Sequence, residues 1–426
     1  MRALIVSAVF PPEPVTSAVT SEQLALGLID AGHKVTVIAP FPSRPAGRLY
    51  PGYRRALRHT EQRPEGYRLI RCFSVLSPRP SLRGRFLENV SFGLTSTLNA
   101  LLARTDVVYS NSWPIIASGL IAGLCAVRRI PLVVSVQDIH PEAAIGVGKL
   151  NSDGPSTRLL KCLDRLVAHR ATMLVAVSEN FADFYRSVRQ VPADKIQVVY
   201  NWMDDDEIRP GPRAGHFRQM LGIPEDIFVV MYAGNIGANA GVECLIEAAH
   251  RLHDVEKLVV YVVGDGSSRA DCEGLTKRLE LANVRFFYPW HRDEVSMVHA
   301  AADVLVLPTR RSGAMTSVPS KLIAYMLSGR PVLAAVAPDS DTARIIRSAG
   351  CGVCIEPENP VVMAQAIRGL LQRPHDLVAM GERGRRYAEE HFSRRVCVPQ
   401  LVRILEAAAQ TKRSAERGVL GRLFSS

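Results

Sequence analysis

The sequence predicts an α/β fold of two lobes, each a doubly wound parallel sheet covered by helices, with a cleft between the lobes. Short, nearly continuous apolar runs alternate with segments of helical periodicity, a pattern typical of parallel strands buried on both faces. The alternation lapses once, near residues 200–215, and then restarts. At 426 residues the chain is also too long for one ordinary core, so two domains are expected.

The first lobe opens with the apolar run RALIVSAVF at residues 2–10 and a proline-rich loop. A helical pattern follows over residues 17–31, and Gly32 marks its end. A helix of small residues is expected over 115–127. The other strand-like runs of this lobe lie at residues 34–40, 106–112, 130–138 and 171–179.

The second lobe repeats the strand–helix alternation after an acidic and then Pro- and Gly-rich stretch. Its strand-like runs lie at residues 227–237, 257–266, 284–290, 302–308, 330–336 and 352–357. Beyond about residue 360 the chain becomes helical and charged. The expected division is a first lobe over 1–203, a linker over 204–215, a second lobe over 216–390, and a terminal helix and tail over 391–426 that returns to the first lobe.

The composition limits the class of partner. Hydrophobic residues make up 47% of the chain and charged residues 22%, which is globular. The net charge of +11 indicates nucleic acid, an anionic membrane surface or a phosphate-bearing substrate. Nucleic acid is disfavoured, because no reading module is recognisable and aromatic residues reach only 6%. The N-terminus lacks a signal-peptide cleavage site, and no tract is long and apolar enough to span a bilayer.

The cysteines do not predict a metal site. The one close pair, Cys351 and Cys354, has no second pair or nearby histidine to complete a zinc site. Free thiols in a reducing cytoplasm fit this pattern best.

Three turns after strands of the second lobe carry small residues. Because open parallel sheets bind ligands beyond the carboxyl ends of their strands, such turns are candidate phosphate or ribose contacts. Strand-to-helix turns also need glycine for purely structural reasons, but three at adjacent strand ends favour a nucleotide cleft. The turns are Gly234-Asn235-Ile-Gly237, Gly264-Asp265-Gly266 and the loop that follows residue 308. Neither GxGxxG after the first strand nor a GxxxxGK[ST] loop is present, which disfavours dinucleotide enzymes and P-loop NTPases.

The stretch VPSKLIAYMLSGRPVL over residues 318–333 places Lys321 where a helix begins. The helix dipole favours cations at the other end, so a lysine beside free backbone N–H groups indicates an anion between them. Ser317 and Ser320 offer hydroxyl groups at the same turn, and Gly313 and Ala314 leave room for close approach. We interpret the site as a diphosphate held by helix N-terminal amides, with Lys321 as the charge partner.

Nearly the whole chain resembles family 4 of the retaining GT-B glycosyltransferases, which have two Rossmann-like lobes. FPPEPVTSAVTSEQLALGLIDAGHKVTVIAP is similar to the family's opening strand–loop–helix–strand. VQDIHPE and VVYNWMD resemble its middle, and YAGNIG, VGDG and VPSKLIAYMLSGRPVLA resemble its donor-lobe signatures. The resemblance is greatest to enzymes of bacterial O-antigen, capsule and slime polysaccharides.

The resemblance implies an acceptor-binding first lobe, a nucleotide-sugar-binding second lobe, and transfer with retention to a lipid-linked saccharide. It implies no metal and no cofactor, with the nucleotide-sugar as substrate. The expected catalytic residues are Lys321, Asp138 and His140. The expected donor-binding residues are Gly234, Asn235, Gly237, Gly264, Asp265, Gly266, Pro289, Ala314, Met315, Thr316, Ser317, Ser320 and Lys321.

The chain departs from the family in its Glu-x7-Glu motif. Thr316 and Ala324 stand where the family has the glutamates that touch the sugar and hold the ribose. The arginine and lysine that face the diphosphate in many members correspond roughly to Asn235 and Ala240. Lys321 is then the remaining cation, joined by Arg310 or Arg311.

In the first lobe, Gln137, Asp138 and His140 leave a strand end. Many relatives have a histidine near position 137. Two interpretations of His140 stay open, that it orients acceptor or sugar hydroxyls and that it only satisfies a turn. Asn201 and Trp202 match a family signature and are expected to pack at the hinge.

Basic segments at 44–59 and 79–86 mix arginines with Tyr, Leu and Phe. They suit an anionic membrane face that carries polyprenyl diphosphate acceptors, and we expect a cytoplasmic protein, peripheral on the inner face of the plasma membrane. The expected membrane or acceptor residues are Arg54, Arg55, Arg58, Arg83 and Arg85. Two alternatives remain open: a GT-B sugar-nucleotide epimerase and a catalytically silent membrane-associated scaffold of a polysaccharide machine.

Overall fold

The computed structural model describes residues 1–44, 46–77, 82–146, 148, 150–288, 294–311 and 318–423, without the side chains of Thr16, Leu82 and 412–423. The predicted residues Pro289, Ala314, Met315, Thr316 and Ser317, with Gly313, lie outside the described residues. The chain forms two compact units. Unit 1 comprises Met1–Tyr200 with Cys397–Ser426, and unit 2 comprises Asn201–Val396.

Unit 1 contains an eight-stranded sheet in the order β3-β4-β2-β1-β5-β6-β7-β8, parallel except for the β3–β4 pair. Its central strands are buried along their whole length, as near-continuous apolar runs predict. The strands are β1 (Arg2–Val6), β2 (Lys34–Pro40), β3 (Arg58–Gln62), β4 (Arg68–Cys72), β5 (Val107–Asn111), β6 (Leu132–Val136), β7 (Met173–Ala176) and β8 (Ile196–Val198).

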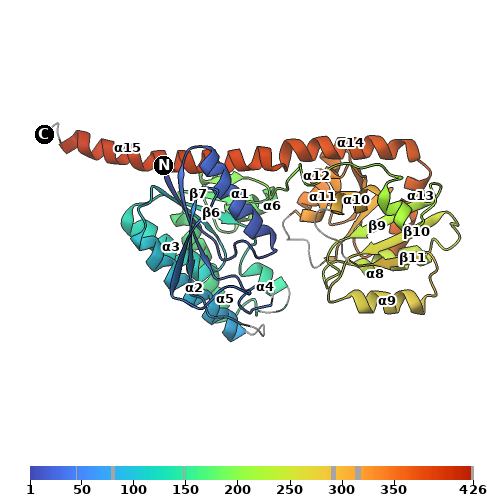
Figure 1. Ribbon diagram of the computed structural model, residues 1–426, viewed down its shortest axis with the longest axis horizontal. Coiled ribbons are helices and arrows are strands. Elements are labelled where there is room, and N and C mark those ends of the chain that lie inside the picture. Colours follow the sequence, from blue (N-terminus) through green and yellow to red (C-terminus); the bar gives the residue numbers. More distant parts are fainter. Residues whose placement is uncertain are drawn as a thin grey trace. The chain divides into compact units, whose positions relative to one another are not determined.

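The helices of unit 1 connect these strands and cover the sheet (Figure 1). They are α1 (Thr16–Asp30), α2 (Leu82–Leu102), α3 (Ile115–Arg128), α4 (Glu142–Gly146), α5 (Pro155–Arg170) and α6 (Glu179–Ser187), with a 3₁₀ turn at Ala193–Lys195. The last helix of the chain, α15 (Arg394–Leu423), contributes its residues from Cys397 onward to this unit. His33 Nε2 lies 2.7 Å from Glu406 Oε1, which fixes α15 beside the end of α1.

Unit 2 contains a six-stranded, fully parallel sheet in the order β11-β10-β9-β12-β13-β14. The chain winds outward from β9 through β11, returns, and winds the other way from β12. Right-handed crossovers therefore place α8 and α9 on one side of the sheet and α11 and α12 on the other (Figure 1). The strands are β9 (Phe228–Ala233), β10 (Leu258–Val263), β11 (Val284–Phe287), β12 (Val304–Pro308), β13 (Val332–Ala335) and β14 (Gly352–Ile355).

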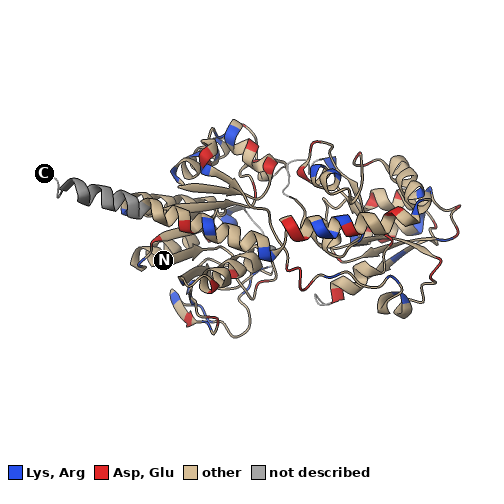
Figure 2. Ribbon diagram, turned by 90° about the horizontal axis from the view of Figure 1, so that it is seen from above, with Lys and Arg blue, Asp and Glu red and all other residues tan. Residues whose placement is uncertain are grey.

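The helices of unit 2 are α7 (His216–Met220), α8 (Val242–His250), α9 (Arg269–Arg278), α10 (Val295–Ala300), α11 (Ser320–Leu327), α12 (Asp341–Ala349), α13 (Pro360–Leu371) and α14 (Pro374–His391). Basic and acidic residues are interspersed along both units, as the blue and red segments of α14 illustrate (Figure 2). The predicted fold class, two doubly wound α/β lobes, is confirmed.

The sequence missed the β3–β4 hairpin and β8. Four of the five residues of β3 are exposed, so the strand carries no apolar run. It lies at the edge of the sheet and pairs antiparallel with β4 alone, so its side chains can stay exposed to solvent. Strand β8 has only three residues, too few for a period to show.

The segment expected as a linker, residues 204–215, lies within unit 2. Arg213 donates to Asp303 Oδ1 at 2.5 Å and to the Glu225 carbonyl at 2.7 Å. Asp205 pairs with Arg395. These contacts, together with the buried side chain of Ile208, attach a polar, Pro-rich segment to the body of unit 2.

One close backbone contact in unit 2 tests how tightly α14 packs. A Cβ at Gly381 of α14 would lie 2.1 Å from the Gly329 carbonyl oxygen, while a Cβ at Gly369 of α13 would meet nothing within 4 Å. We predict that Gly381→Ala lowers the free energy of unfolding by about 1–3 kcal/mol, because the backbone of one element must shift. The matched Gly369→Ala should raise it by about 0.5–1 kcal/mol through helix propensity. Urea denaturation measures both, and equal values for the two variants would contradict the packing.

Candidate functional site

The candidate site lies at the carboxyl end of the unit 2 sheet, where the strand order reverses between β9 and β12. Two turns meet there, Gly234–Gly237 after β9 and Gly264–Gly266 after β10. Both turns require glycine, because φ is 144° at Gly234, 148° at Gly264 and 154° at Gly266. A Cβ at Gly264 would lie 1.9 Å from the Gly234 oxygen, and one at Gly266 would lie 2.5 Å from the Ile236 oxygen. The two turns are therefore in backbone-to-backbone contact.

Lys321 crosses the first of these turns. Its Cε would lie 2.2 Å from a Cβ at Gly234, so only glycine leaves room for this side chain. The ammonium donates to the Tyr232 hydroxyl and, at 3.2 Å, to the Asn235 carbonyl. The Tyr232 hydroxyl also donates to the Asn235 carbonyl, at 2.5 Å. The predicted residues Lys321, Gly234 and Asn235 are thus brought together at the first turn of α11.

The electrostatics of Lys321 are unusual for a lysine. Burial lowers the pKa of Lys321 to about 8, from 10.5. Its described contacts are a hydroxyl, a carbonyl and the Tyr232 ring, whose centroid is 4.6 Å from Nζ. These neutral groups stabilise an ammonium less than a carboxylate would. An anion that binds here would therefore pair with a cation that folding has already partly removed from water.

Two residues that support the glycine turns were missed by sequence reasoning. Tyr325, one turn along α11, donates to the Ala233 carbonyl at 2.9 Å and accepts from its N–H at 3.0 Å, which ties α11 to the end of β9. Arg269, the first residue of α9, donates to the carbonyls of Gly264 and Phe287. The sequence carried a signal for Arg269, since it is also a cation at a helix N-terminus.

The other two predicted cations have acidic partners. Arg310 Nη2 lies 3.0 Å from Glu243 Oε1, and Arg311 Nη2 lies 2.9 Å from Glu356 Oε1. Ala324, at the expected ribose position, is buried in α11. Asp265 accepts from the Gly266 N–H at 2.8 Å and so shapes its own turn. Lys321 therefore differs from the other two predicted cations, because no carboxylate is among its described contacts.

In unit 1 the predicted residues follow β6. Gln137 donates to Ser135 Oγ at 3.1 Å. The side chain of Asp138 is exposed, although neighbouring atoms crowd its carboxylate and raise its pKa. The His140 ring lies against Trp113, with centroids 4.2 Å apart, and burial lowers the pKa of His140 to about 4. His140 is therefore neutral at pH 7 and can donate or accept a hydrogen bond there.

The first loop of unit 1, which follows β1, has two anchors that sequence reasoning missed. The buried Glu13 carboxylate accepts N–H groups from Phe10, Ser43 and Arg44, at 3.1, 2.9 and 2.9 Å. The fully buried Arg71 donates to the carbonyls of Pro11 and Pro40. Both are charged groups that satisfy loop backbone, a role that residue type alone does not reveal.

The remaining predicted residues are dispersed. Trp202 is buried and Asn201 is half-buried at the start of unit 2. Ser320 begins α11. Arg54, Arg55, Arg58 and Arg83 are exposed, and Arg85 pairs with Glu88 at 2.9 Å.

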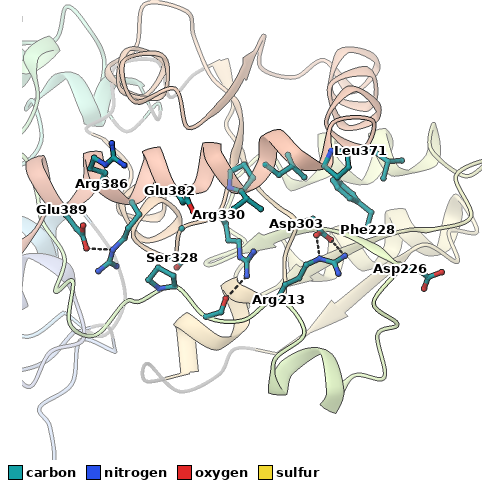
Figure 3. A pocket seen from close by; sticks show the side chains of 18 residues that line it. Arg213, Asp226, Phe228, Asp303, Ser328, Arg330, Leu371, Glu382, Arg386 and Glu389 are labelled. Atoms are coloured by element: carbon teal, nitrogen blue, oxygen red, sulfur yellow. Dashed lines mark hydrogen bonds and ion pairs between the residues drawn. The ribbon is translucent and has the colours of Figure 1, made fainter.

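A cavity of about 750 Å³ lies elsewhere in unit 2, at the amino ends of β9, β12 and β13 (Figure 3). It contains Asp303, which accepts from Arg213 and from Arg218, the latter at 2.7 Å. Asp303 also accepts from the Val229 N–H at 2.7 Å. This end of the sheet is opposite to the glycine turns. Since open parallel sheets bind ligands at their carboxyl ends, the ion pairs here are better explained as attaching the Pro-rich segment.

Among the described residues, no group of three or more His, Cys, Asp and Glu side chains is placed to hold a metal ion. All eight cysteines are free thiols. Within the same described part of the chain, no helix has the length and hydropathy needed to cross a bilayer.

Comparison with known proteins agrees with this geometry. Residues 16–202 match the model of the glycosyl transferase 4-like domain, and residues 227–373 match that of the glycosyl transferases group 1. The chain is 25% identical over 416 residues to the putative colanic acid biosynthesis glycosyl transferase WcaI of Escherichia coli K12, covering 94% of this chain and 99% of WcaI. It is 32% identical over 337 residues to a D-inositol 3-phosphate glycosyltransferase of Geodermatophilus obscurus, covering 75% and 70% of the two chains.

The solved structure of HepE from Anabaena in complex with UDP aligns with a TM-score of 0.70 at 16% identity, covering 96% of this chain and 100% of HepE. This likeness shows the fold. Together with the two domain matches and the relatives above, it leads to one conclusion: the chain belongs to the GT-B glycosyltransferases.

Proposed function

We propose that this glycosyltransferase moves a sugar from a nucleotide-sugar donor to a lipid-linked saccharide acceptor, with retention at the anomeric carbon, in the biosynthesis of a cell-surface polysaccharide. The observation that carries the proposal is Lys321, a half-desolvated ammonium at the point where the unit 2 sheet reverses. HepE, which shares the fold, binds UDP in its solved complex. WcaI, a relative over nearly the full length, is named for colanic acid biosynthesis.

In the proposed mechanism Lys321 and the backbone N–H groups around the Gly234 turn stabilise the charge that develops on the departing diphosphate. The leaving oxygen itself takes the proton of the acceptor hydroxyl, on the same face of the sugar. No metal and no cofactor is then required, because Lys321 supplies the positive charge. Asp138 and His140 are proposed to orient hydroxyl groups, a role that suits the neutral His140 ring.

The proposed acceptor is a polyprenyl diphosphate-linked saccharide, presented at the inner face of the plasma membrane. The exposed arginines Arg54, Arg55, Arg58 and Arg83 of unit 1 support this part of the proposal, because anionic headgroups attract such a surface. The protein would then be cytoplasmic and peripheral.

Transfer is tested by incubating the protein with a panel of nucleotide-sugars, with and without a short polyprenyl diphosphate saccharide. The proposal predicts acceptor-dependent release of the nucleoside diphosphate and an elongated saccharide of retained anomeric configuration. Conversion of the nucleotide-sugar without acceptor would indicate an epimerase. Absence of any thermal stabilisation by millimolar nucleotide-sugars would contradict a donor site, because a bound ligand must stabilise the folded state.

Replacement of Lys321 separates binding from stability. Lys321→Met should weaken nucleotide-sugar binding by about 10- to 100-fold, the effect of losing charge-assisted hydrogen bonds. The same change should leave the melting temperature at pH 7 unchanged or raise it by up to about 4 °C, because a cation whose pKa is depressed by burial is costly to keep. Calorimetric titration and thermal denaturation measure the two effects.

The matched control is Lys257→Met in the same unit, since this lysine is exposed and pairs with Asp226 at 2.9 Å. Lys257→Met should retain the wild-type affinity. Equal affinities in the two variants would remove Lys321 from the donor site.

The pH dependence of binding provides a second test. The pKa of Lys321 in the free protein is about 8, so its ammonium is present at pH 7 and lost as the pH rises through 8. A bound diphosphate raises this pKa, so binding above pH 8 should take up a proton and weaken by up to about tenfold per pH unit. In Lys321→Arg the cation stays charged, and the dependence should flatten between pH 7 and 9. The same slope in both proteins would mean that another group titrates.

A further inference from the structure

Helix α2 of unit 1 exposes an apolar face that the proposed transfer does not explain. Six large apolar side chains of this helix are between 49% and 73% exposed: Phe86, Leu87, Leu94, Leu98, Leu101 and Leu102. At about 100° per residue they fall within roughly 160° of the helix circumference. Isolated exposed leucines are ordinary, but six large apolar side chains exposed along one side of a single helix indicate an interaction surface.

The exposed charge on α2 is basic. Among the described side chains of α2, the one exposed residue that is not apolar is Arg83, and no acidic side chain is exposed. The single glutamate of the helix, Glu88, is 14% exposed and pairs with Arg44 and Arg85.

Basic residues also border the C-terminal end of the stripe. Arg128 Nη1 donates to the Leu101 carbonyl at 2.9 Å, which places the end of α3 beside the end of α2. Val127 is 85% exposed there, and Arg104, Arg128 and Arg129 are exposed with it. Exposed aliphatic side chains and exposed arginines thus occur together at this end.

The other edge of α2 lies near the basic loop before β3. Thr95 Oγ1 donates to the Phe73 carbonyl at 2.7 Å, and the Phe73 N–H donates to the Leu57 carbonyl at 3.1 Å. Leu57 is itself 78% exposed, and it lies in sequence between the exposed Arg55 and Arg58. The loop therefore adds one more exposed aliphatic residue and two more arginines beside the middle of the helix.

We propose that the apolar face of α2 docks unit 1 on an anionic bilayer, with its leucines at the boundary of headgroups and acyl chains and the bordering arginines on the lipid phosphates. An apolar contact with another protein would not require basic residues at its border. An anionic lipid surface matches both features, because interfacial helices combine a buried apolar face with basic residues at its border. The inference deepens the proposed function, on which it rests, by assigning the element that brings unit 1 to a lipid-linked acceptor.

Co-sedimentation with vesicles tests the docking. The wild-type protein should bind vesicles of phosphatidylglycerol and phosphatidylcholine, and bind phosphatidylcholine alone much more weakly. The double variant Leu94→Ser/Leu98→Ser should bind the anionic vesicles at least about tenfold more weakly, because it removes two of the apolar side chains that enter the bilayer on docking. Arg104→Glu/Arg129→Glu should lose at least about fivefold per residue.

The matched control is Met220→Ser/Val378→Ser in unit 2, where the two side chains are 52% and 65% exposed. The control should bind vesicles as the wild type does. All variants should keep the wild-type melting temperature and its increase with nucleotide-sugar, so a failure of docking is distinguishable from a failure of the donor site.

A second measurement does not depend on loss of binding. The fluorescence of a tryptophan at position 98, from Leu98→Trp, should be quenched by brominated lipid in anionic vesicles, while that of Met220→Trp should not. Equal vesicle binding by wild type and Leu94→Ser/Leu98→Ser, or absence of quenching at position 98, would overturn the proposal. Self-association that Leu94→Ser/Leu98→Ser abolishes, without vesicle binding, would also overturn it and would assign the face to a second copy of the chain.

Discussion

The contact between Lys321 and the turn after β9 is the interaction on which the candidate site depends. Sheet topology brings it about, because β9 and β12 are neighbours where the winding direction reverses, so the turn after one strand meets the helix after the other. Gly234 leaves room for the lysine side chain, and Gly264 leaves room for Gly234. Tyr325 ties α11 to the end of β9, so the ammonium is placed by backbone and by the core rather than by a carboxylate.

The burial of Lys321 costs stability, and the proposed donor binding gives a reason for that cost. Lys321, whose pKa has fallen to about 8, is still protonated at pH 7, in surroundings that stabilise its charge less than water does. In the same unit, the buried Arg218 is instead neutralised by Asp303. The difference between Lys321 and Arg218 is the physical reason to associate the former with a ligand and the latter with the fold.

The sequence predicted the two lobes, most of their strands and the assignment of Lys321 and Gly234 to one candidate site, because all three depend on local patterns joined by one topological rule. It could not predict β3, whose side chains are mostly exposed, or the hold of Glu13 and Arg71 on the first loop, since these residues act through distant backbone groups. The ion pairs of Arg310 and Arg311 were equally hidden, because their partners come from other elements. Arg269 is different: it stands at a helix N-terminus as Lys321 does, and the same argument would have found it. The exposed face of α2 was not predicted apart from the basic segment 79–86, because leucines in a sequence do not show which side of a helix stays uncovered.

A crystal structure of the protein with a bound nucleoside diphosphate-sugar would locate the donor site directly. We expect a diphosphate oxygen about 3 Å from Lys321 Nζ, at a charge-assisted hydrogen-bond distance, with backbone N–H groups of the Gly234 turn around it. A diphosphate bound elsewhere, for example among Arg213 and Arg330 in the cavity at the opposite end of the sheet, would contradict it.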